Sequence, residues 1–296
     1  MRSKSSSGLG SEALGFLLLT GLLLGLALPV SRAAIAQGWS ATGLAFWSIA
    51  GAALGLVVAC YGWPHRGTRP AGLRRYGFWN GLLALAWPQA VSFSAAPHIG
   101  VGAMALVVTL SAPLTYCLSV ALGMEALRLR RALGIGIALG GAMVLARGQQ
   151  GVEEGFSWPW FLLALTVPFS LAVGNIYRKK MMPAGVSSIH LARGMLVCGA
   201  LGLLPVAWAT GNIYPALSGM AGWSWLLVQA VLFALGYSVY FRLQKAVNPV
   251  HFSLIGYVMA VVGVIAGLLW FGEQLSLVTG LAMALIVFGV WQAGRR

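Results

Sequence analysis

The sequence predicts an all-α integral membrane protein, and three observations lead to that prediction. Of its 296 residues, 59% are hydrophobic and only 8% are charged, whereas about one residue in four is charged in an ordinary soluble domain. The 40 glycines suit close packing of helices in lipid. Long apolar runs recur along the whole chain. So few charges cannot solvate the surface of a soluble protein of this size, so we expect several membrane crossings.

The apolar runs predict ten transmembrane helices, because a helix needs about 20 mostly apolar residues to cross the hydrocarbon core. The first run has no small-residue cleavage site before the second, so we expect it to be retained rather than removed as a signal peptide. The longest connections, 62–75, 148–157 and 210–220, leave no room for a soluble domain. In chain order the predicted helices cover 11–31, 40–61, 76–96, 99–122, 130–147, 158–178, 187–209, 221–241, 250–270 and 275–293.

Basic residues predict the orientation of these helices. With a cytoplasmic N-terminus, 16 of the 19 Lys and Arg fall on the cytoplasmic side, as the positive-inside rule requires. Both termini are therefore expected in the cytoplasm, with the basic face near anionic lipid headgroups and no nucleic-acid partner. The cytoplasmic set is Arg2, Lys4, Arg66, Arg69, Arg74, Arg75, Arg128, Arg130, Arg131, Arg178, Lys179, Lys180, Arg242, Lys245, Arg295 and Arg296.

Two segments match each other at an offset of 148 residues, half the chain length. Both read E-x-L-x-L with a glycine sixteen residues after the Glu, which gives Glu125 with Gly141 and Glu273 with Gly289. Five helices in each half would make the second copy enter the membrane from the opposite face. We therefore expect two inverted five-helix repeats, residues 1–147 and 148–296, an arrangement that underlies alternating access in many secondary transporters.

The segments around these motifs carry a family resemblance. SAPLTYCLSVALGMEALRLRRALGIGIALGGAMVL places Pro113 twelve residues before Glu125, and GYVMAVVGVIAGLLWFGEQLSLVTGLAMALIVFGV surrounds Glu273. Over nearly its whole length the chain resembles the drug/metabolite transporter superfamily, in its ten-helix EamA-type branch. Gly256 and Tyr257 make it similar to the YddG-type amino-acid exporters within that branch. The resemblance implies a central cavity lined mainly by helices 1, 3, 4, 6, 8 and 9.

The sequence departs from that family at two positions. Val261 stands where a proline is common in the second half, so the ninth helix is expected to be less kinked than the fourth. Ser48 stands where many members have arginine in the second helix, whereas Arg193 keeps the counterpart in the seventh.

Prolines near the middle of the predicted helices point to hinges and to the binding region. Pro88, Pro113 and Pro168 each remove a backbone hydrogen bond, which would free the carbonyls of Ala84, Thr109 and Ala164. In lipid a free carbonyl must face protein or a water-filled cavity. A packing kink explains any one of these prolines as well, but three at similar depth favour a shared cavity.

Polar and aromatic residues near these prolines are the candidate substrate contacts. Amide and hydroxyl groups can bond the ammonium of a zwitterion, and aromatic faces can attract a cation or pack against an apolar side chain. Any single aromatic residue here is more often ordinary packing. The candidates are Asn80, Trp87, Gln89, Phe169, Asn175, Tyr237, Ser253 and Tyr257, with Tyr240 one turn from Tyr237.

The composition argues against several kinds of chemistry. The chain has no Asp, and its four His and three Cys form no metal-binding spacing. We therefore expect no metal, no cofactor and no enzymatic activity, since intramembrane catalysis needs paired carboxylates, clustered histidines or an activated nucleophile. A protein scaffold or receptor stays open but has no specific support.

These features predict a secondary transporter that exports amino acids, aromatic and other neutral ones, or similar metabolites across the inner membrane. No acid lies deep in a predicted helix, so transport is expected to be passive and by alternating access. The alternative is a proton-coupled exporter of cationic drugs, with Glu12 as its carboxylate. Partners would be the small solute and membrane lipid, and we expect a monomer, with a dimer as the alternative.

Overall fold

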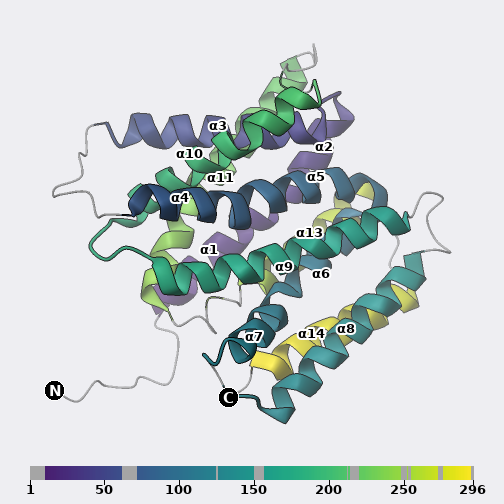
Figure 1. The fold of residues 1–296 in the computed structure, drawn as a ribbon. Helices are drawn as coiled ribbons and strands as arrows, with labels where there is room; N and C mark the ends of the chain where they lie inside the picture. The colour runs from purple at the N-terminus through teal and green to yellow at the C-terminus, as the bar shows by residue number, and fades with distance from the viewer. Residues whose placement is uncertain are drawn as a thin grey trace, which may run out of the picture.

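The computed structural model describes residues 11–61, 72–124, 126–149, 157–211, 213, 220–247, 252, 255–272 and 276–294. Across these ranges the chain is helical with short connecting turns, and they contain no strand. The helices lie side by side in a bundle, and α8 and α14 form a pair along one edge (Figure 1). The all-α class is therefore confirmed for the described residues.

Helices occupy every predicted range, and three ranges are divided. The first half contains α1 (Ser11–Gly25), α2 (Ala27–Ala36), α3 (Ala41–Ala59), α4 (Leu73–Gly81), the π-helix η1 (Leu82–Ala86), α5 (Trp87–Ile99), α6 (Val101–Thr109), α7 (Ser111–Ala121) and α8 (Leu129–Gln149). The second half contains α9 (Trp158–Met181), α10 (Ser188–Ala209), α11 (Met220–Ala246), α13 (Ile255–Phe271) and α14 (Leu277–Gly294).

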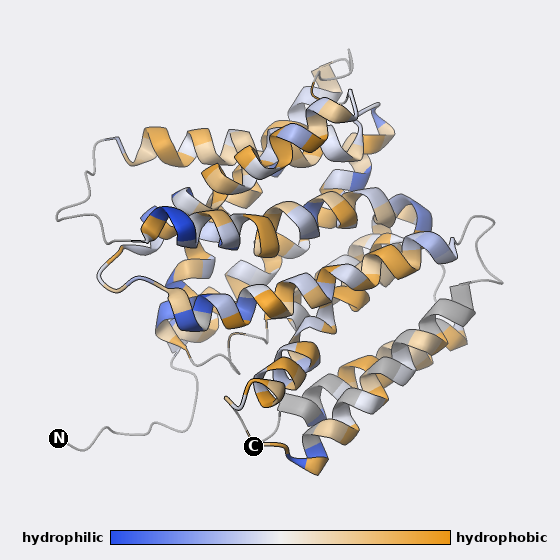
Figure 2. Cartoon of the chain, in the orientation of Figure 1, coloured by the Kyte–Doolittle hydropathy of each residue, from blue (hydrophilic) through white to orange (hydrophobic). Residues whose placement is uncertain are grey.

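Length and composition suit these helices to a membrane. Among the described residues, six helical stretches are long and apolar enough to cross one, and Val258–Phe271 and Gly280–Gly289 are shorter apolar helices. Apolar positions run along the helices, whereas most strongly hydrophilic ones lie near helix ends (Figure 2). The ten crossings and the cytoplasmic termini stay predictions.

Two of the three divisions lie three residues before a proline. The first range divides at Leu26, before Pro29, and the fourth at Leu110, before Pro113. Both leucines keep right-handed helical dihedral angles, with ψ of −15° and −11°. The chain therefore bends there without unwinding, because the proline ring clashes with the preceding turn and supplies no N–H.

The helix is not divided at Pro168, the third predicted hinge. Pro168 lies inside α9, which runs without interruption from Trp158 to Met181. This long helix packs against α5, α7 and η1. The expected contrast between the fourth and ninth helices is seen, since α13 is also unbroken from Ile255 to Phe271, where Val261 replaces the proline.

Helix pairing relates the two halves of the chain. α3 packs on α10, α6 on α13 and α8 on α14, and each of these pairs joins the same position of the two predicted repeats. The contact of α1 with α11 has its counterpart in the contact of α9 with α5. The pattern is the one that two halves related by a two-fold axis would give.

Glycines allow α8 and α14 to approach closely. A Cβ atom added to Gly141 would lie 2.9 Å from Ile286, and one added to Gly289 would lie 2.4 Å from the backbone nitrogen of Ala138. Gly141 faces Ile286 and Gly289 faces Ala138, so a later residue of α14 faces an earlier residue of α8. The two helices are therefore antiparallel. Their buried residues belong to a small core shared with α6 and α13, separate from the larger core of the other helices.

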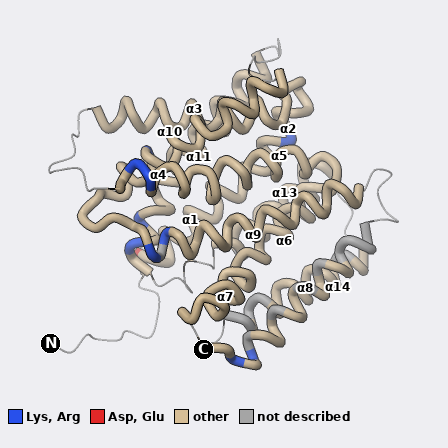
Figure 3. Tube along the Cα trace, viewed as in Figure 1, with Lys and Arg blue, Asp and Glu red and all other residues tan. Residues whose placement is uncertain are grey.

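Cations gather toward one end of the bundle. Lys and Arg lie at the start of α4, at the ends of α9 and α11, and at the start of α8, whereas the basic position on α2 lies toward the other end (Figure 3). Arg32 places its guanidinium over the ring of Phe271, 4.5 Å from the centroid.

Candidate functional site

A buried polar cluster joins α4, α7 and α9. Tyr76 and Asn80 lie one turn apart on α4, and Asn175 and Arg178 lie one turn apart on α9. The Arg178 guanidinium donates to Asn80 Oδ1 at 2.9 Å through Nη1 and to Asn175 Oδ1 through Nη2. Asn175 Nδ2 in turn donates to Thr115 Oγ1 on α7 at 3.0 Å. The structure thus brings together two predicted site residues, Asn80 and Asn175, through an arginine.

Arg178, which the positive-inside rule assigns to the cytoplasmic side, is buried within the protein, and its side of the membrane stays a prediction. α9 continues to Met181, so Arg178 lies within the helix, and its side chain is 1% exposed. Its guanidinium lies over the ring of Tyr240, 5.4 Å from the centroid. It forms no ion pair with a carboxylate in the part of the chain that the structure describes, where Glu12 is the one acidic residue and is exposed.

Three donor atoms of this cluster have no partner among the described residues. They are Arg178 Nε, Asn80 Nδ2 and the Tyr76 hydroxyl. Arg178 and Asn80 are buried to 1% and 0% exposure, and Tyr76 is buried beside them. Buried polar atoms are nearly always hydrogen-bonded, so this place is suited to a bound molecule.

Two more of the predicted site residues, Gln89 and Tyr237, contact each other. Gln89 Nε2 donates to the Tyr237 hydroxyl at 3.3 Å, which joins α5 to α11. Tyr237 packs against Tyr240, with their ring centroids 5.7 Å apart, and Tyr240 meets the ring of Phe252 edge to face at 4.7 Å. Aromatic faces therefore border the polar cluster on the α11 side.

Gln89 and Tyr237 also occupy equivalent positions of the two predicted repeats. They are 148 residues apart, the same offset that relates the two E-x-L-x-L motifs. Phe93 and Phe233, four residues away on each helix, stack at 6.3 Å. Equivalent residues that touch each other are expected where a two-fold axis passes between them.

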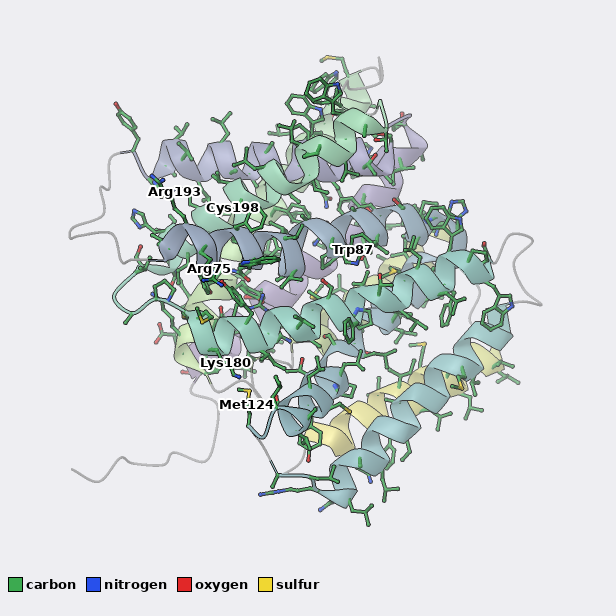
Figure 4. The ribbon with its side chains drawn as sticks, in the orientation of Figure 1. Arg75, Trp87, Met124, Lys180, Arg193 and Cys198 are labelled. Atoms are coloured by element: carbon green, nitrogen blue, oxygen red, sulfur yellow. The ribbon has the colours of Figure 1, made fainter. Side chains whose placement is uncertain are left out.

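Two predicted site residues lie apart from the cluster. Trp87 is 44% exposed and donates through Nε1 to Thr166 Oγ1 at 3.1 Å, and Phe169 is 53% exposed. Trp87 lies partway along the α4–η1–α5 rod, away from the basic end that Arg75 and Lys180 mark (Figure 4). Ser253 lies outside the described residues, and of Tyr257 the structure describes only the backbone within α13.

A side chain bonds the Leu83 carbonyl, which is next to the Ala84 carbonyl predicted to be freed by Pro88. Pro88 follows the π-helix η1, in which the N–H of a residue bonds the carbonyl five residues earlier. Proline has no N–H, so at the five-residue spacing the Leu83 carbonyl is left without a backbone donor. The Ser170 hydroxyl donates to the Leu83 carbonyl at 2.7 Å, so a side chain of α9 takes the place of the missing donor.

Arg178, Tyr76 and Thr115 were not among the predicted site residues. The predicted sixth helix, 158–178, already places Asn175 and Arg178 three residues apart and so on one face, and that spacing is the signal that could have found the arginine. The described residues contain no group of His, Cys, Asp or Glu that could hold a metal ion.

Comparisons with known proteins agree with this architecture. Residues 158–293 match the EamA-like transporter family. The chain is 30% identical over 215 residues to the uncharacterized inner membrane transporter YedA of Escherichia coli K12, covering 71% of this chain and 67% of that protein. It is 32% identical over 110 residues to the protein PecM of Dickeya dadantii, 36% of each chain. A crystal structure of a protein 18% identical superposes with a TM-score of 0.65 over 97% of this chain and 99% of that one, which shows a shared fold.

Proposed function

We propose, because the chain belongs to the EamA-like transporter family of the drug/metabolite transporter superfamily, that it exports neutral amino acids, aromatic ones included. It is a multi-pass protein of the inner membrane and a small-molecule transporter.

The buried cluster around Arg178 is the observation that supports an amino-acid substrate. A zwitterion needs hydrogen-bond donors and positive charge for its carboxylate, acceptors for its ammonium, and apolar surface for its side chain. Arg178, Asn80 and Tyr76 supply donors, the Tyr237 hydroxyl can accept as well as donate, and the rings of Tyr240 and Phe252 supply apolar surface.

The pairing of helices supports alternating access. Equivalent helices of the two halves pack on each other, and Gln89 and Tyr237, which occupy equivalent positions, form a hydrogen bond. Two similar halves that meet across such a centre can exchange conformations and open the site to each face in turn. The bends at Leu26 and Leu110 would provide flexible points for that motion.

Proton-coupled export of cationic drugs receives no support from the site. A buried guanidinium repels a cation, and such a pump would need a carboxylate near the bound drug. Glu12, the carboxylate proposed for that role, is exposed at the start of α1. We therefore propose passive transport, in which the solute runs down its own gradient.

Counterflow in proteoliposomes tests the proposal. Vesicles containing the purified protein are loaded with an unlabelled amino acid, and entry of the labelled form is measured for each of the neutral amino acids. We expect transient accumulation of at least one, with protein-free vesicles as the control. Failure to exchange any amino acid would refute the substrate class.

A pH gradient across the same vesicles tests passive transport. We expect the final internal concentration of the solute to equal the external one with or without the gradient, and Glu12→Gln to transport at the wild-type rate. Accumulation against the solute gradient, abolished by Glu12→Gln, would instead establish proton coupling.

A further inference from the structure

Arg178 is a buried cation that forms no ion pair with a described residue. Its side chain is 1% exposed, and within the described residues it contacts only neutral groups: two amide oxygens and a tyrosine ring. A charge in a low-dielectric interior is costly unless an opposite charge accompanies it. Intramembrane arginines therefore usually mark functional sites, in which an anionic partner balances the positive charge.

The hydrogen bonds that the cluster leaves unused define that partner. The side-chain oxygens of Asn80 and Asn175 both accept from Arg178, so neither amide offers its acceptor freely. Two atoms without partners, Arg178 Nε and Asn80 Nδ2, are donors only, and the third, the Tyr76 hydroxyl, can donate as well as accept. Surplus donors around a fixed positive charge match a group that only accepts hydrogen bonds and carries negative charge.

These atoms belong to one neighbourhood. Arg178 bonds Asn80 directly, and Tyr76 precedes Asn80 by one turn on the same face of α4. The Arg178 guanidinium also lies over the ring of Tyr240, 5.4 Å from the centroid. A planar guanidinium edge suits a planar carboxylate, which it can hold through two parallel bonds.

We propose that Arg178, with Asn80 and Tyr76, binds the carboxylate of the transported solute, so that the substrates of this transporter are carboxylates. The inference rests on the proposed function and narrows it: the carboxylate is a required feature of the solute, and its replacement by an uncharged carboxamide abolishes recognition. The aromatic rings on the α11 side then receive the remainder of the solute.

The test compares phenylalanine with phenylalaninamide, which differs from it only at the carboxyl group. Competition with a labelled transported amino acid is measured in proteoliposomes, and thermal stabilisation by each compound is measured on the purified protein. We expect the wild type to prefer the acid by about 10- to 100-fold, the factor associated with hydrogen bonds to a charged group. Arg178→Met should remove the preference, and Arg178→Lys should keep part of it.

The matched control is Arg193→Met, which removes another basic residue within the helices but lies on α10 outside the cluster. It should keep the acid-to-amide ratio of the wild type. A variant that only weakens the fold lowers binding of both compounds alike, so the ratio separates recognition from stability.

The outcomes distinguish this inference from the proposed function. Transport by Arg178→Met with the preference for the acid intact would overturn the inference and leave the transport proposal standing. Selective stabilisation of the wild type by the acid, lost in Arg178→Met, without counterflow of any amino acid would support the carboxylate site and refute the export proposal. Absence of both signals in the wild type would refute both.

Discussion

At the scale of single residues, a basic side chain near a helix end ordinarily reports only topology. Arg178 is an exception, because it lies one turn before the end of its helix and is buried in a polar cluster. α9 extends to Met181 and ends two residues before Pro183, since the residue before a proline disfavours the helical conformation. Lys180 is exposed beyond the site, whereas Arg178 faces Asn80, 98 residues away in the sequence.

Ser170→Ala should destabilise the protein, because Ser170 replaces the donor that Pro88 lacks. Removing its hydroxyl leaves the Leu83 carbonyl without a donor in a partly buried place, where the loss should approach the cost of an unsatisfied buried acceptor, about 1–3 kcal/mol. Ser94→Ala is the control, since the Ser94 hydroxyl bonds the Ala90 carbonyl that already accepts within the helix. Denaturation of the purified variants should show the larger loss for Ser170→Ala; equal losses would contradict this account.

The bond between Gln89 and Tyr237 should matter for transport more than for folding. Tyr237→Phe removes the acceptor of Gln89 Nε2, and we expect the KM of the exported amino acid to rise several-fold, consistent with about 1 kcal/mol for a hydrogen bond. A double-mutant cycle with Gln89→Leu should show coupling, because both changes remove the same bond. Strictly additive effects on KM would show that the bond has no role in the site.

At the scale of helices, the lengths of the apolar runs predicted where each helix lies in the sequence. They did not predict where a helix is divided. Pro113 and Pro168 are both mid-helix prolines, yet the chain divides before one and is continuous through the other. The difference depends on what packs around each proline. A hydroxyl such as that of Ser170, far along the chain, can compensate a missing donor. One sequence does not display such pairings, so the bond between Ser170 and the Leu83 carbonyl could not be predicted.

The antiparallel pairing of α8 and α14 should depend on two glycines. Gly141→Ala and Gly289→Ala would place a Cβ atom 2.9 Å or less from the backbone of the facing helix, and overpacking of this kind costs about 1–3 kcal/mol. Gly140→Ala and Gly280→Ala are matched controls on the same helices, since a Cβ atom there meets nothing within 4 Å. We expect lower denaturation midpoints for the first pair only. Midpoints unchanged in all four would show that the helices can separate freely.

At the scale of the whole molecule, the sequence predicted the helical class and the helix ranges because both depend on composition along the chain. The candidate residues were predicted in part. Asn80 and Asn175 meet around one arginine, and Gln89 meets Tyr237, because they lie on helices that the resemblance assigned to the centre. Trp87 and Phe169 are instead about half exposed. The neighbours of a helix decide which of its faces turns inward. These helices are apolar on nearly all sides, so their sequences contain no amphipathic pattern that predicts the inward face.

The inverted relation of the two halves gives a prediction about the whole chain. Residues 148 positions apart should lie on opposite sides of the membrane, because an odd number of helices separates them. Alkaline phosphatase is active only outside the cytoplasm, so a fusion after Gly148 should be active and one after Arg296 inactive. Green fluorescent protein at the same two positions should give the reverse result and controls for expression. Equal phosphatase activity at both positions would mean that the halves are parallel, and the antiparallel approach of α8 and α14 would then need another explanation.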